Sequence, residues 1–114
     1  MIKAVVLIKR KQGVSQEAFR EHYEEVHAPL ALKHLPMIRR YVRNHVMPMP
    51  GTQEQAFDCL TELWFDDLED VLRLAAFVQS EEGRVIREDE EKFIDRDKTL
   101  FCLVDERVSV VDPK

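Results

Sequence analysis

The chain has 114 residues, of which 45% are hydrophobic and 34% charged, which fits one domain over residues 1–114 with a core of its own. Its formal net charge is −5 and its basic residues are dispersed, which argues against binding to a nucleic-acid backbone. The apolar run in MIKAVVLIKRK is too short for a membrane span and lacks the flanks of a signal peptide. With two cysteines and no C-x-x-C motif, we expect a cytoplasmic protein without a disulfide framework.

The first predicted elements are a strand over residues 2–9 and a helix that begins after Ser15, a suitable N-cap. We expect Pro29 to kink or end this helix around residues 27–28, because proline lacks a backbone donor. His27 would then lie near a helix C-terminus, where the dipole raises its pKa and partial burial lowers it. It borders an apolar stripe at helical spacing formed by Phe19, Tyr23, Val26 and Leu30.

The remaining elements follow in order. Alternating patterns predict strands over residues 38–46, 57–65 and 99–110, and the proline-rich residues 47–55 predict a loop. Asp66 or Asp67 is expected to cap a helix whose buried stripe comprises Leu68, Val71, Leu72, Ala75 and Val78. A third helix is expected over residues 84–94, with the acidic run at 88–91 facing solvent and Ile86, Phe93 and Ile94 facing the core.

This order of elements, β-α-β-β-α-(α)-β, is the ferredoxin-like split βαβ pattern of the α+β class. It predicts a four-stranded antiparallel sheet with helices on one face. The uncovered face would still carry large apolar groups, with Trp64 or Phe65 among them. Because an exposed apolar patch of this size usually marks a partner surface, we expect a homodimer in which two sheets pack face to face.

His27 and Tyr41 are the residues that most suggest chemistry. An imidazole and a phenol can exchange protons with an enolisable small molecule, and the two residues lie on consecutive elements. The alternative is that His27 is a structural histidine at the edge of the core. Five further residues complete the candidate ligand-binding set: Phe19, Tyr23, His45, Glu62 and Trp64. For His45 a surface position, and for Trp64 a core or interface position, are the alternatives.

No metal or cofactor is expected. His22 and His27 are separated by five residues, so they splay about 140° apart on a helix and cannot chelate zinc together as an i, i+4 pair does. The acidic run at residues 88–91 is more typical of a solvated helix face than of a cation site. The chain also lacks a P-loop and a G-x-G-x-x-G motif.

Four segments together resemble the EthD family: KRKQGVSQEAFREHYEEVHAPL, LPMIRRYVRNHV, FDCLTELWFDDLEDV and EDEEKFID. The resemblance implies a dimeric α+β barrel built from two ferredoxin-like sheets. Related proteins include methylmuconolactone methylisomerase, and the wider superfamily includes polyketide cyclases and cofactor-free monooxygenases. By similarity to the isomerase, His27 and Tyr41 match the helix histidine and strand tyrosine of its proposed site. The further loop histidine of that enzyme has no clear counterpart here.

Two functional hypotheses follow. In the first, the protein is a cofactor-independent enzyme, such as an isomerase, cyclase, dehydratase or monooxygenase, acting on a carbonyl-containing catabolic or polyketide-like intermediate. His27 would transfer the proton and Tyr41 would stabilise the enolate oxygen. In the second, it is a non-catalytic binding or accessory protein for a small hydrophobic ligand or for haem, with His27 as the haem ligand.

Overall fold

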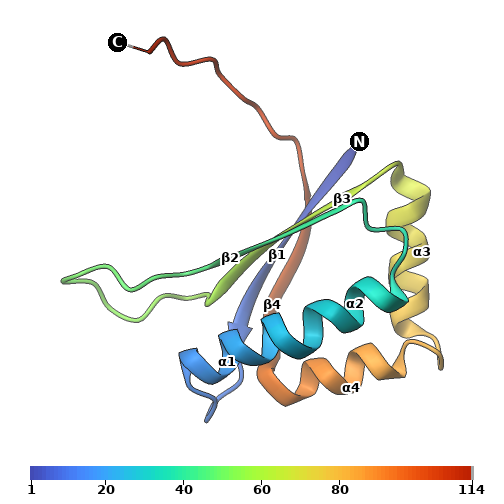
Figure 1. The fold of residues 1–114 in the computed structure, drawn as a ribbon, viewed down its shortest axis with the longest axis horizontal. Helices are drawn as coiled ribbons and strands as arrows, with labels where there is room; N and C mark the ends of the chain where they lie inside the picture. The colour runs from blue at the N-terminus through green and yellow to red at the C-terminus, as the bar shows by residue number, and fades with distance from the viewer. Residues whose placement is uncertain (114) are drawn as a thin grey trace.

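The computed structural model describes residues 1–113 and has the predicted ferredoxin-like fold (Figure 1). Its sheet has the strand order β2-β3-β1-β4, and every neighbouring pair is antiparallel. The helices cover one face of this sheet (Figure 1). In chain order, the elements are β1 (Ile2–Arg10), α1 (Gln16–His22), the π-helical turn η1 (Tyr23–His27), α2 (Ala28–His34), β2 (Arg40–His45), β3 (Cys59–Phe65), α3 (Leu68–Gln79), α4 (Arg84–Phe93) and β4 (Ile94–Val104).

The register of the sheet decides which side chains face the helices. On β1, Ala4 pairs with Leu63 of β3 and Leu103 of β4, so these side chains share the inner, helix-covered face. Val5 pairs with Glu62 and therefore lies on the outer face. The alternation predicted for β3 is confirmed: Cys59, Leu63 and Phe65 are buried on the inner face, while Leu60, Glu62 and Trp64 share the outer one.

The first helix does not end around residues 27–28, which was one of the two outcomes predicted for Pro29. It widens at η1, where the N–H of Ala28 donates to the carbonyl of Tyr23, and continues as α2. Pro29 lies in the first turn of α2, a position where a missing donor is tolerated. Ser15 caps α1 as predicted, because its Oγ accepts a hydrogen bond from the N–H of Ala18 at 3.0 Å.

The wide turn also rotates the buried stripe. A π-helical turn takes in more residues than the 3.6 of an α-helix, so the stripe continues at His27 and Ala31 instead of Val26 and Leu30. Val26 is 45% exposed, whereas His27 is only 6% exposed. The prediction that His27 borders the core is therefore wrong, because its side chain is buried. The prediction that it lies near a helix C-terminus is also wrong, because α2 follows η1 without a break.

The second pair of helices corrects two further predictions. On α3, Val71 is buried as expected, but Leu68 and Leu72 are 49% and 61% exposed. On α4, the acidic run does not form a uniformly solvated face, because Asp89 is only 4% exposed and Glu90 is half-buried. No helix among residues 1–113 combines the length and apolar character needed to cross a membrane.

The last strand begins at Ile94, earlier than predicted, and ends at Val104, so the strand expected over residues 99–110 is displaced toward the N-terminus. A register shift between Leu7 and Lys9 lets β4 continue past a local irregularity in its pairing with β1. Residues 105–113 then run away from the sheet (Figure 1).

Candidate functional site

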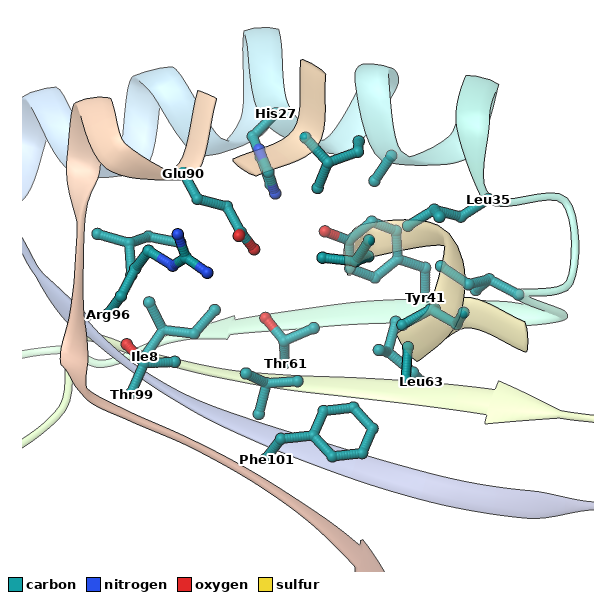
Figure 2. Close-up of a pocket in the computed structure, with 18 of the residues that line it drawn as sticks. Ile8, His27, Leu35, Tyr41, Thr61, Leu63, Glu90, Arg96, Thr99 and Phe101 are labelled. Carbon is teal, nitrogen blue, oxygen red and sulfur yellow. The ribbon is translucent and has the colours of Figure 1, made fainter. Parts of the chain in front are cut away.

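A cavity of about 350 Å³ lies between the helices and the inner face of the sheet (Figure 2). Its volume is within the range of small-molecule sites. Most of its wall is aliphatic and comes from every strand and from α2, α3 and α4. A few polar side chains project into this apolar space, among them His27, Tyr41, Thr61, Glu90, Arg96 and Thr99 (Figure 2).

His27 is held by a buried carboxylate. Its Nδ1 lies 2.9 Å from Oδ2 of Asp89, which is 4% exposed and comes from α4. Asp89 also bonds Nε2 of His22 at 3.0 Å, so both histidines share one acceptor. Since a carboxylate only accepts hydrogen bonds, the proton of the neutral His27 ring is on Nδ1. The unprotonated Nε2 is therefore left for the cavity, into which the ring points (Figure 2).

Burial lowers the pKa of His27 below its ordinary value of 6.5, although the hydrogen bond to Asp89 acts in the opposite direction. Of these two opposing effects on the pKa, burial is therefore the larger. A lowered pKa keeps the imidazole neutral near neutral pH, the state in which it can accept a proton.

Tyr41 lines the same cavity, and its hydroxyl is the first of a chain of three hydrogen-bonded hydroxyl groups. Its hydroxyl donates to that of Tyr23 at 3.1 Å, and the Tyr23 hydroxyl lies 2.6 Å from Oγ1 of Thr61. Burial raises the pKa of Tyr41 to about 12 and that of Tyr23 well above its usual value. Both phenols therefore stay protonated near neutral pH. Because each hydroxyl can donate or accept, reversing the chain frees the Tyr41 proton for a ligand oxygen.

The structure brings only part of the candidate site together. His27, Tyr41 and Tyr23 line the cavity. Phe19 is 1% exposed and packs in the core outside the cavity lining, with its ring centroid 6.0 Å from that of Tyr23. The Nε2 of His45 lies 2.7 Å from a carboxylate oxygen of Glu24, outside the cavity lining.

Glu62 and Trp64 lie across the sheet from the cavity. Glu62 pairs with Lys3 at 2.6 Å, and this contact lowers the pKa of the Glu62 carboxyl. The Trp64 ring has Lys3 and Arg40 each 4.7 Å from its centroid, an arrangement typical of cation–π contacts. Any ligand role of these two residues stays a prediction, and it concerns the outer face of the sheet.

The sequence analysis missed Asp89 and Glu90 as site residues, although a signal was present. Counted from Ile86, these residues stand at i+3 and i+4 and Phe93 at i+7, so all four share one helix face. Thr61 was also missed; it follows Cys59 by two residues and therefore shares the inner face of β3. Arg96 gave no comparable signal, because it lies within an irregular stretch of β4.

Metal binding has no support from the arrangement of donors. Among residues 1–113, no group of three or more histidine, cysteine, aspartate or glutamate side chains could hold a metal ion. The carboxylate of Asp89 instead serves His22 and His27 as a hydrogen-bond acceptor. That the protein carries no metal stays a prediction for elemental analysis.

Solved structures share this fold at low sequence identity. An EthD family protein from Bacillus halodurans is 22% identical, with a TM-score of 0.68 over 94% of this chain and 100% of the other. A protein from Arabidopsis thaliana is 17% identical, with a TM-score of 0.64 over 97% of this chain and 100% of the other. A protein from Bacteroides fragilis, described as dimeric and ferredoxin-like, is 19% identical, with a TM-score of 0.58 over 94% and 95%. At these identities the likeness shows the fold alone.

Sequence comparison is more specific. No curated protein matches the chain with statistical significance. The family model of the EthD domain, however, matches residues 11–97, which include both η1 and α4 and so the His27–Asp89 pair. The match spans well over half of the chain, and the protein therefore belongs to the EthD family.

Proposed function

We propose that this protein binds a small carbonyl-containing molecule, of a catabolic or polyketide-like kind, in the cavity and moves a proton on it. The observation that carries the proposal is the orientation of His27. A buried base with Nδ1 fixed by a carboxylate and Nε2 open to an apolar cavity is suited to remove a proton from carbon. A fixed ring orientation also places the base without an entropic cost at the moment of reaction.

In this proposal His27 Nε2 takes the proton α to the carbonyl group, and negative charge develops on the carbonyl oxygen. The Tyr41 hydroxyl donates a hydrogen bond to that oxygen, supported by the hydroxyls of Tyr23 and Thr61. The largely aliphatic wall lowers the polarity around these contacts, which strengthens them. Return of the proton to a different carbon would complete an isomerisation, the reaction type implied by the resemblance to methylmuconolactone methylisomerase.

The second hypothesis, a binding protein without catalysis, is favoured by the largely aliphatic cavity wall. Such a cavity can hold a hydrophobic ligand with no chemical step. A visible absorption spectrum of the purified protein separates out the haem case, because haem bound through His27 would give a strong Soret band.

A homodimer and a cytoplasmic location belong to the same proposal. Helices cover only the inner face of the sheet, and the outer face keeps apolar side chains at Val5, Leu7, Val42, Leu100 and Val104. Of these, Leu100 is 54% exposed and Val104 is 38% exposed. A second copy packed on this face would bury them. Light scattering at micromolar concentration should give twice the chain mass, and a monomer mass would overturn the dimer.

Deuterium exchange tests the catalytic proposal. Methylmuconolactone is incubated with the protein in D2O, and proton NMR follows loss of the signal from its side-chain methylene group, which lies α to the carboxyl group. We expect exchange to be faster with the wild type than with His27→Ala, and Tyr41→Phe to reduce it less. His22→Ala is the control, because it removes the other histidine on Asp89 without changing a cavity-lining residue. Equal exchange rates for wild type and His27→Ala would reject His27 as the base.

A further inference from the structure

The two ends of the cavity differ in polarity. Leu35 and Leu63 mark one end, while Glu90 and Arg96 mark the other, and His27 points into the space between them (Figure 2). Apart from the tyrosine hydroxyls, the ionisable groups that line the cavity are His27, Glu90 and Arg96. A ligand lying along the cavity would therefore have an apolar body at one end and a charged or polar group at the other.

Arg96 has hydrogen-bonding capacity to spare. Its ion pair is with Glu91 on the solvent side, at 3.7 Å, beyond hydrogen-bond distance. Within residues 1–113 its guanidinium donates no hydrogen bond to another side chain or to the backbone, and it extends into the cavity beside Glu90 (Figure 2). A guanidinium keeps its charge at any ordinary pH and offers five donors in a planar fork that matches a carboxylate.

Glu90 has no hydrogen-bond or ion-pair partner within the same residues, although its carboxyl group points into the cavity (Figure 2). Burial raises the pKa of this carboxyl; Asp89 adds to that effect, whereas Arg96 and Arg87 oppose it. The same cavity is lined by His27, which is neutral near neutral pH, and by the uncharged hydroxyls of Tyr23 and Tyr41. Glu90 is therefore the charge in this cavity that is most readily neutralised by a proton.

We propose that the cavity takes a small molecule with an apolar body and one carboxylate, that this carboxylate binds Arg96, and that Glu90 takes up a proton when the anion binds. The inference rests on the proposed function, because it concerns the same cavity. Arg96 supplies a charge that cannot be removed, while two carboxylates side by side disfavour double ionisation and share a proton. This orientation would place the middle of the ligand below His27.

Two probes that differ only in charge test the proposal. The affinities of 2-naphthoate and the neutral 2-naphthamide are measured by NMR titration between about pH 6 and 8, where the naphthoate is ionised. We expect the wild type to bind naphthoate roughly tenfold more tightly than the amide at the lower pH, as for a charge-assisted hydrogen bond. The naphthoate affinity should weaken as the pH rises, because a proton must accompany the anion.

Two variants assign these effects. Arg96→Met should remove the preference for naphthoate and leave amide binding unchanged, whereas Lys92→Met, which removes an exposed cation of α4 outside the cavity, should keep the preference. Glu90→Gln should make the naphthoate affinity independent of pH in this range. Its control is Glu88→Gln, an exposed position on the same helix that should behave like the wild type.

The outcomes separate this inference from the function on which it rests. Equal affinity for the two probes, or a naphthoate preference that survives Arg96→Met, overturns the anion site and leaves the cavity as a binding site. A pH dependence that survives Glu90→Gln overturns the coupled protonation. Binding of neither probe overturns both this inference and the proposed small-molecule cavity.

Discussion

Replacement of Asp89 by asparagine removes the carboxylate that both histidines share. Asp89 is 4% exposed and its oxygens lie 2.9 Å from His27 Nδ1 and 3.0 Å from His22 Nε2. The amide of Asp89→Asn has one oxygen acceptor. It either leaves one histidine facing an NH2 group or serves both rings from the position of Oδ2, which lies 3.1 Å from His22 Nε2, without the charge of a carboxylate. Leaving a buried donor unpaired costs about 1–3 kcal/mol. For a chain of this length, each kcal/mol corresponds to roughly 4 °C in melting temperature.

The loss of stability in Asp89→Asn should also depend on pH. Because the pKa of His27 is below 6.5 in the folded protein, the unfolded chain binds more protons below that value, and stability falls as the pH falls through this range. Asp89 is the group that raises the pKa of His27 against burial, so Asp89→Asn should lower it further. The loss of melting temperature relative to wild type should therefore be larger near pH 5 than near pH 7.

Glu88→Gln is the matched control for this experiment. It makes the same acid-to-amide change at the preceding residue, whose side chain is 64% exposed, and should shift the melting temperature little. Calorimetry gives the stabilities, and NMR titration of the histidine ring protons gives the pKa of His27. If Asp89→Asn melts like Glu88→Gln at both pH values and the titration of His27 is unchanged, the Asp89–His27 contact does not have the role inferred here.

Three further predictions concern stability. Val71→Ala should lower the free energy of unfolding by about 1–2 kcal/mol and Leu72→Ala by much less, because the side chains are 6% and 61% exposed; equal losses by denaturant titration would contradict the orientation of α3. Gly83→Ala should be strongly destabilising, since a Cβ there would lie 2.0 Å from the carbonyl oxygen of Phe77; a wild-type melting temperature would refute the close approach. Arg43 lowers the pKa of the Glu24 carboxyl to about 2, so wild type should lose stability relative to Glu24→Gln as the pH falls from 4.5 toward 2. If the stabilities of the two proteins fall in parallel over this pH range, the Arg43–Glu24 ion pair contributes nothing to stability.

The sheet could be predicted because successive side chains of a strand point to opposite faces, so alternation of apolar and polar residues is visible in the sequence. Glu62 and Trp64 alternate with Leu63 and Phe65, and the structure separates them onto opposite faces. The order of strands and helices then leaves few topologies. The topology therefore does not depend on the detailed geometry of any helix.

The site was less predictable because it depends on helix geometry. Burial of His27 comes from the π-helical turn before it, and a constant angle of about 100° per residue cannot represent such a turn. Asp89 and Glu90 were assigned to solvent from the acidity of their segment, yet their spacing from Ile86 and Phe93 decides their orientation. The position of Tyr41 on the cavity is easier to predict, because it depends on a strand and not on helix geometry; its role stays a prediction.

The central claim is that His27 presents an unprotonated Nε2 to a ligand cavity. Long-range proton–nitrogen NMR of the histidine rings at about pH 7 tests it most directly, because the nitrogen shifts report the tautomer. We predict that His27 is neutral, carries its proton on Nδ1 and shifts at Nε2 when 2-naphthoate is added. A proton on Nε2, or a His27 signal that does not change while the probe binds, would contradict the claim.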